Sequence, residues 1–76
     1  MTLPELKTLL DSGEFHHATY RNIGTVWEGL WIYRRSPTGC RGFDLVDAFN
    51  HRNPDCHAAE EMVRGTGVSV GSFGNG

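Results

Sequence analysis

Six side chains of the sequence could bind a metal ion or take part in acid–base or thiol chemistry. They are His16, His17, Cys40, His51, Cys56 and His57. The chain has no Cys-x-x-Cys pair, the spacing most typical of a small zinc site, and neighbours such as Cys56 and His57 would point about 100° apart on a helix. Cys56 lies near a predicted helix N-terminus, where a thiol can be acidified, but it also lies on that helix's apolar face, where a small thiol is buried and inert. We therefore predict no metal site and no cofactor.

A second possible chemistry uses a histidine and a carboxylate. The strand registers derived below place His17, Gly29 and Asp47 in one row across three strands, and the glycine would leave room for the outer two to meet. Such a pair could act as a catalytic dyad in a small hydrolase, or it could be a structural pair in which the imidazole satisfies the carboxylate. We favour the structural pair over a catalytic one, because so short a chain can hardly enclose a substrate pocket, and we leave an enzymatic function open as the less favoured alternative.

The composition narrows the function classes. The chain has 76 residues, with nine acidic and seven basic side chains and a net charge of −2. This length predicts a single small domain over residues 1–76. The charge argues against a protein that binds nucleic acid through phosphate contacts. We find no signal peptide and no apolar run of membrane-spanning length, and two cysteines allow at most one disulfide, so we predict a cytoplasmic protein with reduced thiols.

The elements that must position these residues begin with a helix near the N-terminus. Thr2 and Glu5 have capping-box spacing, Pro4 lies in the first turn, and Gly13 is placed to end the helix. One face of this helix is apolar and must be buried. That face contains Leu3, Leu6, Leu9 and Leu10.

A second helix follows Asn53 and Pro54, which favour the N-cap and the first helical position, and it should end at Gly65. Its apolar face contains Cys56, Ala59, Met62 and Val63. Residues 66–76 are rich in glycine, and we predict a short edge strand followed by a frayed tail there.

Between the helices the pattern predicts an antiparallel meander of three strands, at about residues 15–22, 25–35 and 40–49. The segment from Ser36 to Gly39 has the residues of a tight turn. The predicted fold class is therefore α+β: helix, three-stranded meander, helix and a short fourth strand, with both helices packed on one face of the sheet.

The strand register decides which face is the core. With Ser36 opposite Cys40, the aromatic residues of two strands would share a face. The resulting pairs are Tyr33 with Phe43, Trp31 with Leu45, Gly29 with Asp47, and Trp27 with Phe49. A weaker assumption about the turn at residues 21–24 adds Phe15 opposite Trp31 and His17 opposite Gly29. We predict that this aromatic face is the core beneath the helices, because large aromatic side chains could stabilise so short a chain. The alternative is an open stacking platform.

The opposite face would then expose an aliphatic strip bordered by charges, which is typical of a protein contact site. The predicted partner-binding residues are Val26, Glu28, Leu30, Ile32, Arg34 and Val46. The main hypothesis is a protein-interaction or self-associating accessory domain, which binds a protein partner or a second copy through the sheet face opposite the helices. The alternative is a nucleic-acid or nucleotide-binding module that uses Trp27, Trp31 and Tyr33 with Arg34, Arg35 and Arg41. A hydrolase built on His17 and Asp47 is the third.

Overall fold

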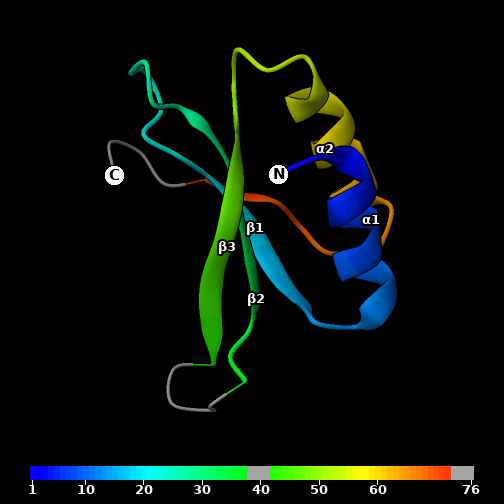
Figure 1. Ribbon diagram of the computed structural model, residues 1–76. Helices are drawn as coiled ribbons and strands as arrows, with labels where there is room; N and C mark the ends of the chain where they lie inside the picture. The colour runs from blue at the N-terminus through cyan, green and yellow to red at the C-terminus, as the bar shows by residue number, and fades with distance from the viewer. Residues whose placement is uncertain (38–41, 73–76) are drawn as a thin grey trace.

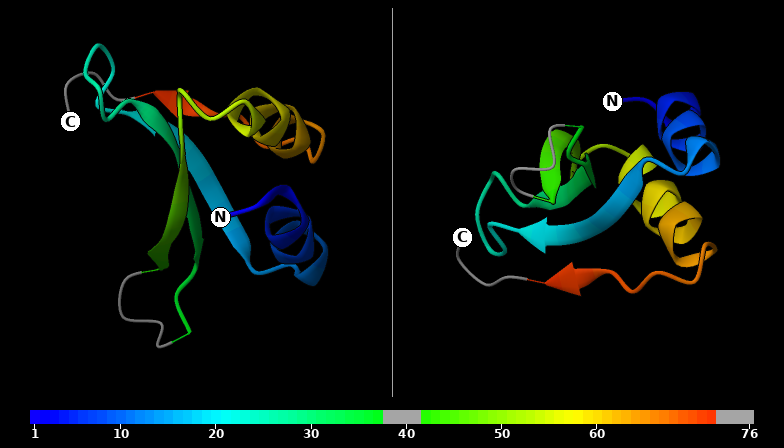
Figure 2. Two further views of the ribbon diagram at one scale, coloured as in Figure 1. Left: turned by 45° about the horizontal axis from the view of Figure 1, so that its top comes forward. Right: turned by 90° about the horizontal axis from the view of Figure 1, so that it is seen from below.

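The computed structural model describes residues 1–37 and 42–72 and has the predicted α+β architecture (Figure 1). Its elements are α1 (Leu3–Ser12), β1 (Phe15–Arg21), β2 (Gly29–Arg35), β3 (Phe43–Asn50), α2 (Asp55–Arg64) and β4 (Gly71–Ser72). Both helices lie on one side of the sheet, as predicted, and the other side is uncovered by any helix (Figure 2). Within the described ranges, neither helix has the length and apolar character needed to cross a membrane.

The sheet has four strands in the order β3-β2-β1-β4. β1, β2 and β3 form the predicted antiparallel meander, and β4 runs parallel to β1, with Thr19 opposite Gly71. The short fourth strand is therefore present, although it starts after Val68 and Val70, which instead pack against the core. β3 and β4 are the two edges of the sheet.

The cap signals of α1 are confirmed. The Thr2 hydroxyl accepts a hydrogen bond from the Glu5 N–H at 3.4 Å, and the Thr2 N–H donates to the Glu5 carboxylate at 2.9 Å. Gly13 ends the helix with a φ of 79°, a left-handed conformation that glycine adopts without strain. The helix buries Leu6 and Leu9 against the sheet, so its apolar face is used as predicted.

α2 also begins and ends near its predicted signals. The Asn53 side-chain oxygen accepts a hydrogen bond from the Asp55 N–H at 2.9 Å, which satisfies one donor of the first turn. The helix ends at Arg64, but Gly65 keeps a right-handed conformation, and the left-handed glycine is Gly67 with a φ of 89°. Cys56, Ala59 and Val63 are its buried residues.

The prediction that the tryptophan face is the core is wrong. Leu30 and Ile32 are fully buried beneath the helices, whereas Trp27 is 72% exposed and Trp31 is partly exposed. The core cluster consists of Leu6, Leu9, Phe15, Ala18, Leu30, Ile32, Phe49, Cys56, Ala59 and Val63. Most of these side chains are aliphatic or small, and they let two helices lie close to the sheet.

The physical reason is the register of β3. The Ser36 N–H donates to the Gly42 carbonyl at 3.2 Å, so the hairpin closes with Ser36 opposite Gly42 and not opposite Cys40. The residues of the predicted tight turn at positions 38–41 lie outside the described part of the chain. A bulge at Val46 then adds one residue to β3, which places Phe49 opposite Leu30 and not opposite Trp27. Phe49 thereby joins the aliphatic face, and that face becomes the core.

The register of β1 differs as well. The loop after β1 runs from residue 22 to residue 28 and contains positive φ angles at Asn22 and Gly24, so it is longer than the predicted turn. His17 is therefore opposite Tyr33 and not opposite Gly29. A second bulge, at His16, lets Phe15 enter the core while His17 lies on the uncovered face.

Candidate functional site

The first of two candidate sites is the face of the sheet that no helix of the described residues covers, and we call it the open face. The strand register shows which side chains share this face, because directly opposed residues point to the same side of a sheet. Trp31 is opposite Thr19 of β1 and Ala48 of β3. Tyr33 is opposite His17 of β1 and Leu45 of β3. It consists of His17, Thr19 and Arg21 from β1, Trp31, Tyr33 and Arg35 from β2, Phe43, Leu45 and Ala48 from β3, and Trp27 from the loop before β2. Several of its apolar side chains face solvent: Trp27 is 72%, Leu45 50% and Phe43 41% exposed. So much exposed apolar surface on one side of a small domain is typical of a contact site.

A shallow groove of about 380 Å³ crosses the β2–β3 half of the open face. It is lined by Trp27, Gly29, Trp31, Leu45, Val46, Asp47, Ala48 and Asn50. The guanidinium of Arg21 lies 4.8 Å from the centre of the Trp31 ring and donates a hydrogen bond to the Tyr33 hydroxyl at 3.0 Å. These contacts fix the indole, so Trp31 presents a preformed wall of the groove.

Beside the groove, four rings form an aromatic cluster that includes both neighbouring histidines. His17 stacks on Tyr33 with ring centres 4.4 Å apart, and Phe43 meets His17 edge to face at 4.8 Å. The Nδ1 atoms of His16 and His17 are 2.8 Å apart, so one ring donates to the other. Burial, and next the nearby His16, lower the pKa of His17 below its usual 6.5. The cluster therefore favours a neutral His17.

The carboxylates of the strands lie away from the open face. In the strand register, Asp44 is opposite Arg34 and Asp47 is opposite Ile32. Ile32 is buried beneath the helices and Arg34 is two residues further along β2, so both carboxylates lie on the helix side of the sheet. Asp47 borders the groove, but its carboxylate accepts a hydrogen bond from the Met1 ammonium group at 2.7 Å. The open face therefore combines apolar and aromatic groups with the cationic side chains Arg21 and Arg35.

The six residues predicted to bind a partner do not form one strip. Leu30 and Ile32 are in the core. Val26 and Glu28 lie in the loop before β2, where the Glu28 carboxylate accepts a hydrogen bond from the Gly24 N–H at 2.9 Å. The side chain of Arg34 is on the helix side of the sheet, and Val46 is 39% exposed at the bulge of β3. Sequence reasoning missed Phe43 and Leu45 as surface residues, because it placed them in the core with the tryptophans.

The predicted row of His17, Gly29 and Asp47 is also wrong. His17 is on the open face against Tyr33, and Asp47 is on the helix side with Met1. The hydrogen bond from the Met1 ammonium, and next that from the Ala48 N–H, lower the pKa of the Asp47 carboxyl. A His17–Asp47 dyad therefore does not form, and the hydrolase hypothesis that depended on it is withdrawn.

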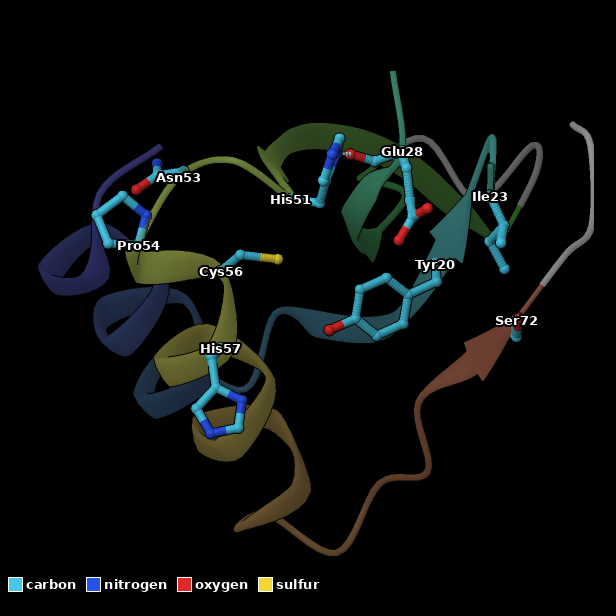
Figure 3. A pocket seen from close by; sticks show the side chains of 9 residues that line it. All are labelled: Tyr20, Ile23, Glu28, His51, Asn53, Pro54, Cys56, His57 and Ser72. Atoms are coloured by element: carbon cyan, nitrogen blue, oxygen red, sulfur yellow. Dashed lines mark hydrogen bonds between the residues drawn. The ribbon is translucent and has the colours of Figure 1, made fainter. Parts of the chain in front are cut away.

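A second candidate site is a cleft of about 500 Å³ between the start of α2 and the end of β1 (Figure 3). Its lining residues are Tyr20, Ile23, Glu28, His51, Asn53, Pro54, Cys56, His57 and Ser72. The Cys56 sulfur points into the cleft between Tyr20 and His51. His51 Nδ1 lies 2.9 Å from the Glu28 carbonyl oxygen, and the Tyr20 hydroxyl donates a hydrogen bond to the Glu60 carboxylate.

The groups in this cleft are not activated for chemistry. Burial raises the pKa of the Cys56 thiol, so the protonated, weakly nucleophilic form is favoured. Burial, and next the hydrogen bond to Glu60, raise the pKa of the Tyr20 hydroxyl. Among the residues that the structure describes, no three histidine, cysteine or acidic side chains come together to hold a metal ion, and Cys40 falls outside those residues. The cleft can enclose a small group, and burial favours the protonated forms of its Cys56 thiol and Tyr20 hydroxyl.

Searches against protein-family models, curated proteins and solved structures find no match to this chain.

Proposed function

We propose that this chain is a protein-binding domain that contacts its partner through the open face. The observation that carries the proposal is the exposure of Trp27, Phe43 and Leu45 on the side of the sheet that no helix covers. Fully burying a large apolar side chain contributes about 1.5 to 3 kcal/mol, so these three partly exposed groups supply part of the free energy that offsets the cost of association.

The composition of the open face supports a protein partner in particular. Tryptophan, tyrosine and arginine are the residues in which binding energy is most often concentrated, and a preformed aromatic wall loses little entropy when a partner binds. Arg21 already holds Trp31 in place. Arg21 and Arg35 can orient a partner without supplying most of the affinity.

The nucleic-acid alternative is supported less well. Of its three predicted stacking groups, Tyr33 is only 6% exposed because His17 covers its ring. Arg34 alternates onto the helix side, away from the two tryptophans. Arg41 lies outside the described residues, and the described cations of the open face are Arg21 and Arg35. With a net charge of −2, the counterion release that drives binding to phosphates would be small.

The test is selection of peptides from an unbiased displayed library on the immobilised domain, followed by affinity measurement on two variants. Leu45→Glu places a charge in the groove of the open face, and the selected peptides should lose at least about tenfold in affinity, because the charge cannot be solvated in the complex. Lys7→Glu is the matched control on an exposed position of α1, and it should bind like the parent. Circular dichroism checks that both variants fold.

Selected peptides that bind Leu45→Glu as tightly as the parent would exclude the open face as the binding surface. Quenching of tryptophan fluorescence by an oligothymidylate at micromolar concentration, without any selected peptide, would favour the nucleic-acid alternative instead. Light scattering at high protein concentration tests the self-association hypothesis separately. The cytoplasmic location stays a prediction from the sequence.

A further inference from the structure

The outer edge of β3 is open to another strand. β3 has eight residues and lies at the end of the sheet, so half of its backbone N–H and C=O groups face away from β2. The Ala48 N–H already donates to the Asp47 carboxylate at 2.7 Å. Its apolar side chains are exposed on both sides of this edge, since Leu45 is 50% and Val46 39% exposed. An exposed strand edge with apolar groups beside it is a template for pairing with another chain.

Grooves flank this edge on both sides of the sheet. On the open face lies the groove with Trp31 and Leu45, described above. On the helix side, a groove of about 360 Å³ lies between α1 and β3 and is lined by Met1, Glu5, Thr8, Leu9, Ser12, Glu14 and Val46. Val46, the bulge residue, belongs to both grooves. Figure 2 shows α1 on the β3 side of the sheet, where it forms one wall of the second groove.

The two grooves differ in charge. The carboxylates of Glu5 and Glu14 are exposed and line the groove beside α1, and Asp44 alternates onto the same side of β3. Two cations lie on this side as well, since the Met1 ammonium pairs with Asp47 and Arg34 lies opposite Asp44. The four carboxylates outnumber these two cations, so the groove is acidic. The groove on the open face has mainly aromatic and aliphatic walls, with Asp47 and Asn50 among its lining residues and the cation Arg21 behind Trp31. A strand laid along β3 would point alternate side chains into these two grooves, because side chains of a strand alternate between its faces.

From this arrangement we propose that the partner adds an extended segment to the edge of β3 as a further strand, with apolar side chains in the open-face groove and lysine or arginine side chains in the α1–β3 groove. The inference rests on the proposed function and specifies the partner's chemistry. Backbone hydrogen bonds to β3 supply affinity in this mode of recognition, and the alternate grooves supply specificity.

A second copy of the chain fits this edge poorly. Pairing β3 with the β3 of another molecule would bring Asp44 toward the acidic groove of the other copy, whereas Asp47 already pairs with the Met1 ammonium of its own chain. Like charges placed opposite one another on paired strands are destabilising. The charge pattern therefore selects a basic and apolar segment of a different protein.

The test uses an eight-residue peptide that alternates lysine and valine, with two matched controls. One control replaces every lysine by glutamate, and the other carries N-methyl groups on alternate residues, which blocks the backbone edge that would pair. The lysine–valine peptide should bind and slow amide hydrogen exchange along β3. Both controls should bind at least about tenfold more weakly, because each removes either the charge match or the backbone hydrogen bonds.

Two double variants test the acidic groove. Glu5→Gln with Glu14→Gln should weaken the lysine–valine peptide about threefold to tenfold, since each exposed ion pair contributes modestly. Glutamine at position 5 keeps the capping box, so α1 should stay intact. Asp11→Asn with Glu61→Gln removes two exposed acids elsewhere and should leave binding unchanged.

The outcomes separate this inference from the proposed function. Tight binding of the N-methylated or the glutamate peptide would overturn strand addition, and so would an unchanged affinity in the Glu5→Gln, Glu14→Gln variant. If library-selected peptides still lose affinity on Leu45→Glu in that case, the open face remains the binding surface. If the selected peptides bind the Leu45→Glu variant as tightly as the parent, the proposed function itself is wrong.

Discussion

Truncating Leu30 should destabilise this domain much more than truncating its neighbour Trp31. The two residues are adjacent in β2, but Leu30 is fully buried under the helices and Trp31 is on the open face. Removing a buried leucine side chain beyond Cβ costs about 2.5 to 5 kcal/mol, because apolar contacts are lost and a cavity remains. A domain of this size has a net stability of about 4 to 11 kcal/mol.

For Trp31→Ala we expect a loss of about 1 to 2 kcal/mol, from the contact with Arg21 and the partly buried area of the indole. Urea unfolding followed by circular dichroism gives both free energies of unfolding. Fluorescence is unsuitable here, because one variant removes a fluorophore. A loss of about 2.5 to 5 kcal/mol should lower the melting temperature of Leu30→Ala by about 10 to 40 °C.

The assignment of the two faces would be refuted by the reverse order. If Leu30→Ala unfolds like the parent while Trp31→Ala loses most of the stability, the tryptophan face is the core after all. Ile32→Ala is the second variant on the helix side, and it should behave like Leu30→Ala because Ile32 is also fully buried.

Three further predictions test individual contacts. Gly29→Ala should cost about 1 to 3 kcal/mol, because a Cβ there would lie 2.5 Å from the Phe49 carbonyl oxygen, and thermal unfolding measures the loss. Tyr20→Phe should cost about 1 kcal/mol in urea unfolding, because its hydroxyl no longer donates to Glu60. Since the pKa of His17 is lowered in the folded state, its contribution to stability is complete above pH 6.5 and is lost as the pH falls through the folded pKa. The melting temperature should therefore fall from pH 7 to pH 5 in the parent, and fall less in His17→Phe; equal slopes would contradict the role of His17.

Local signals predicted the helices well, because a cap is determined by a few neighbouring residues. Thr2 and Glu5 bond to each other within one turn, and the left-handed Gly13 follows directly. No distant part of the chain has to be known for such a prediction. The alternation of β2 was equally visible, with Leu30 and Ile32 on one side and Trp31 and Tyr33 on the other.

Alternation alone could not decide which side of β2 faces the helices, because both sides are apolar. The decision depended on Phe49, and the position of Phe49 depends on the hairpin length and on the bulge at Val46. A bulge of one residue leaves no reliable mark in the sequence, yet it moves every later side chain to the other face. The open face was therefore considered only as the alternative stacking platform, and its residues Phe43 and Leu45 were assigned to the core.

The two bulges also determine where the chain can gain or lose a residue. If Val46 were deleted, Leu45 and Asp47 would be consecutive residues, still opposite Tyr33 and Ile32. The strand pairing would then be regular, and every side chain would stay on its present face of the sheet. Deleting His16 would do the same for β1. A deletion inside β2, which has no bulge, would exchange its two faces and bring Trp31 into the place of a core residue. Length variation among sequences that share this fold should therefore concentrate at these two positions of β1 and β3, while β2 keeps a fixed length.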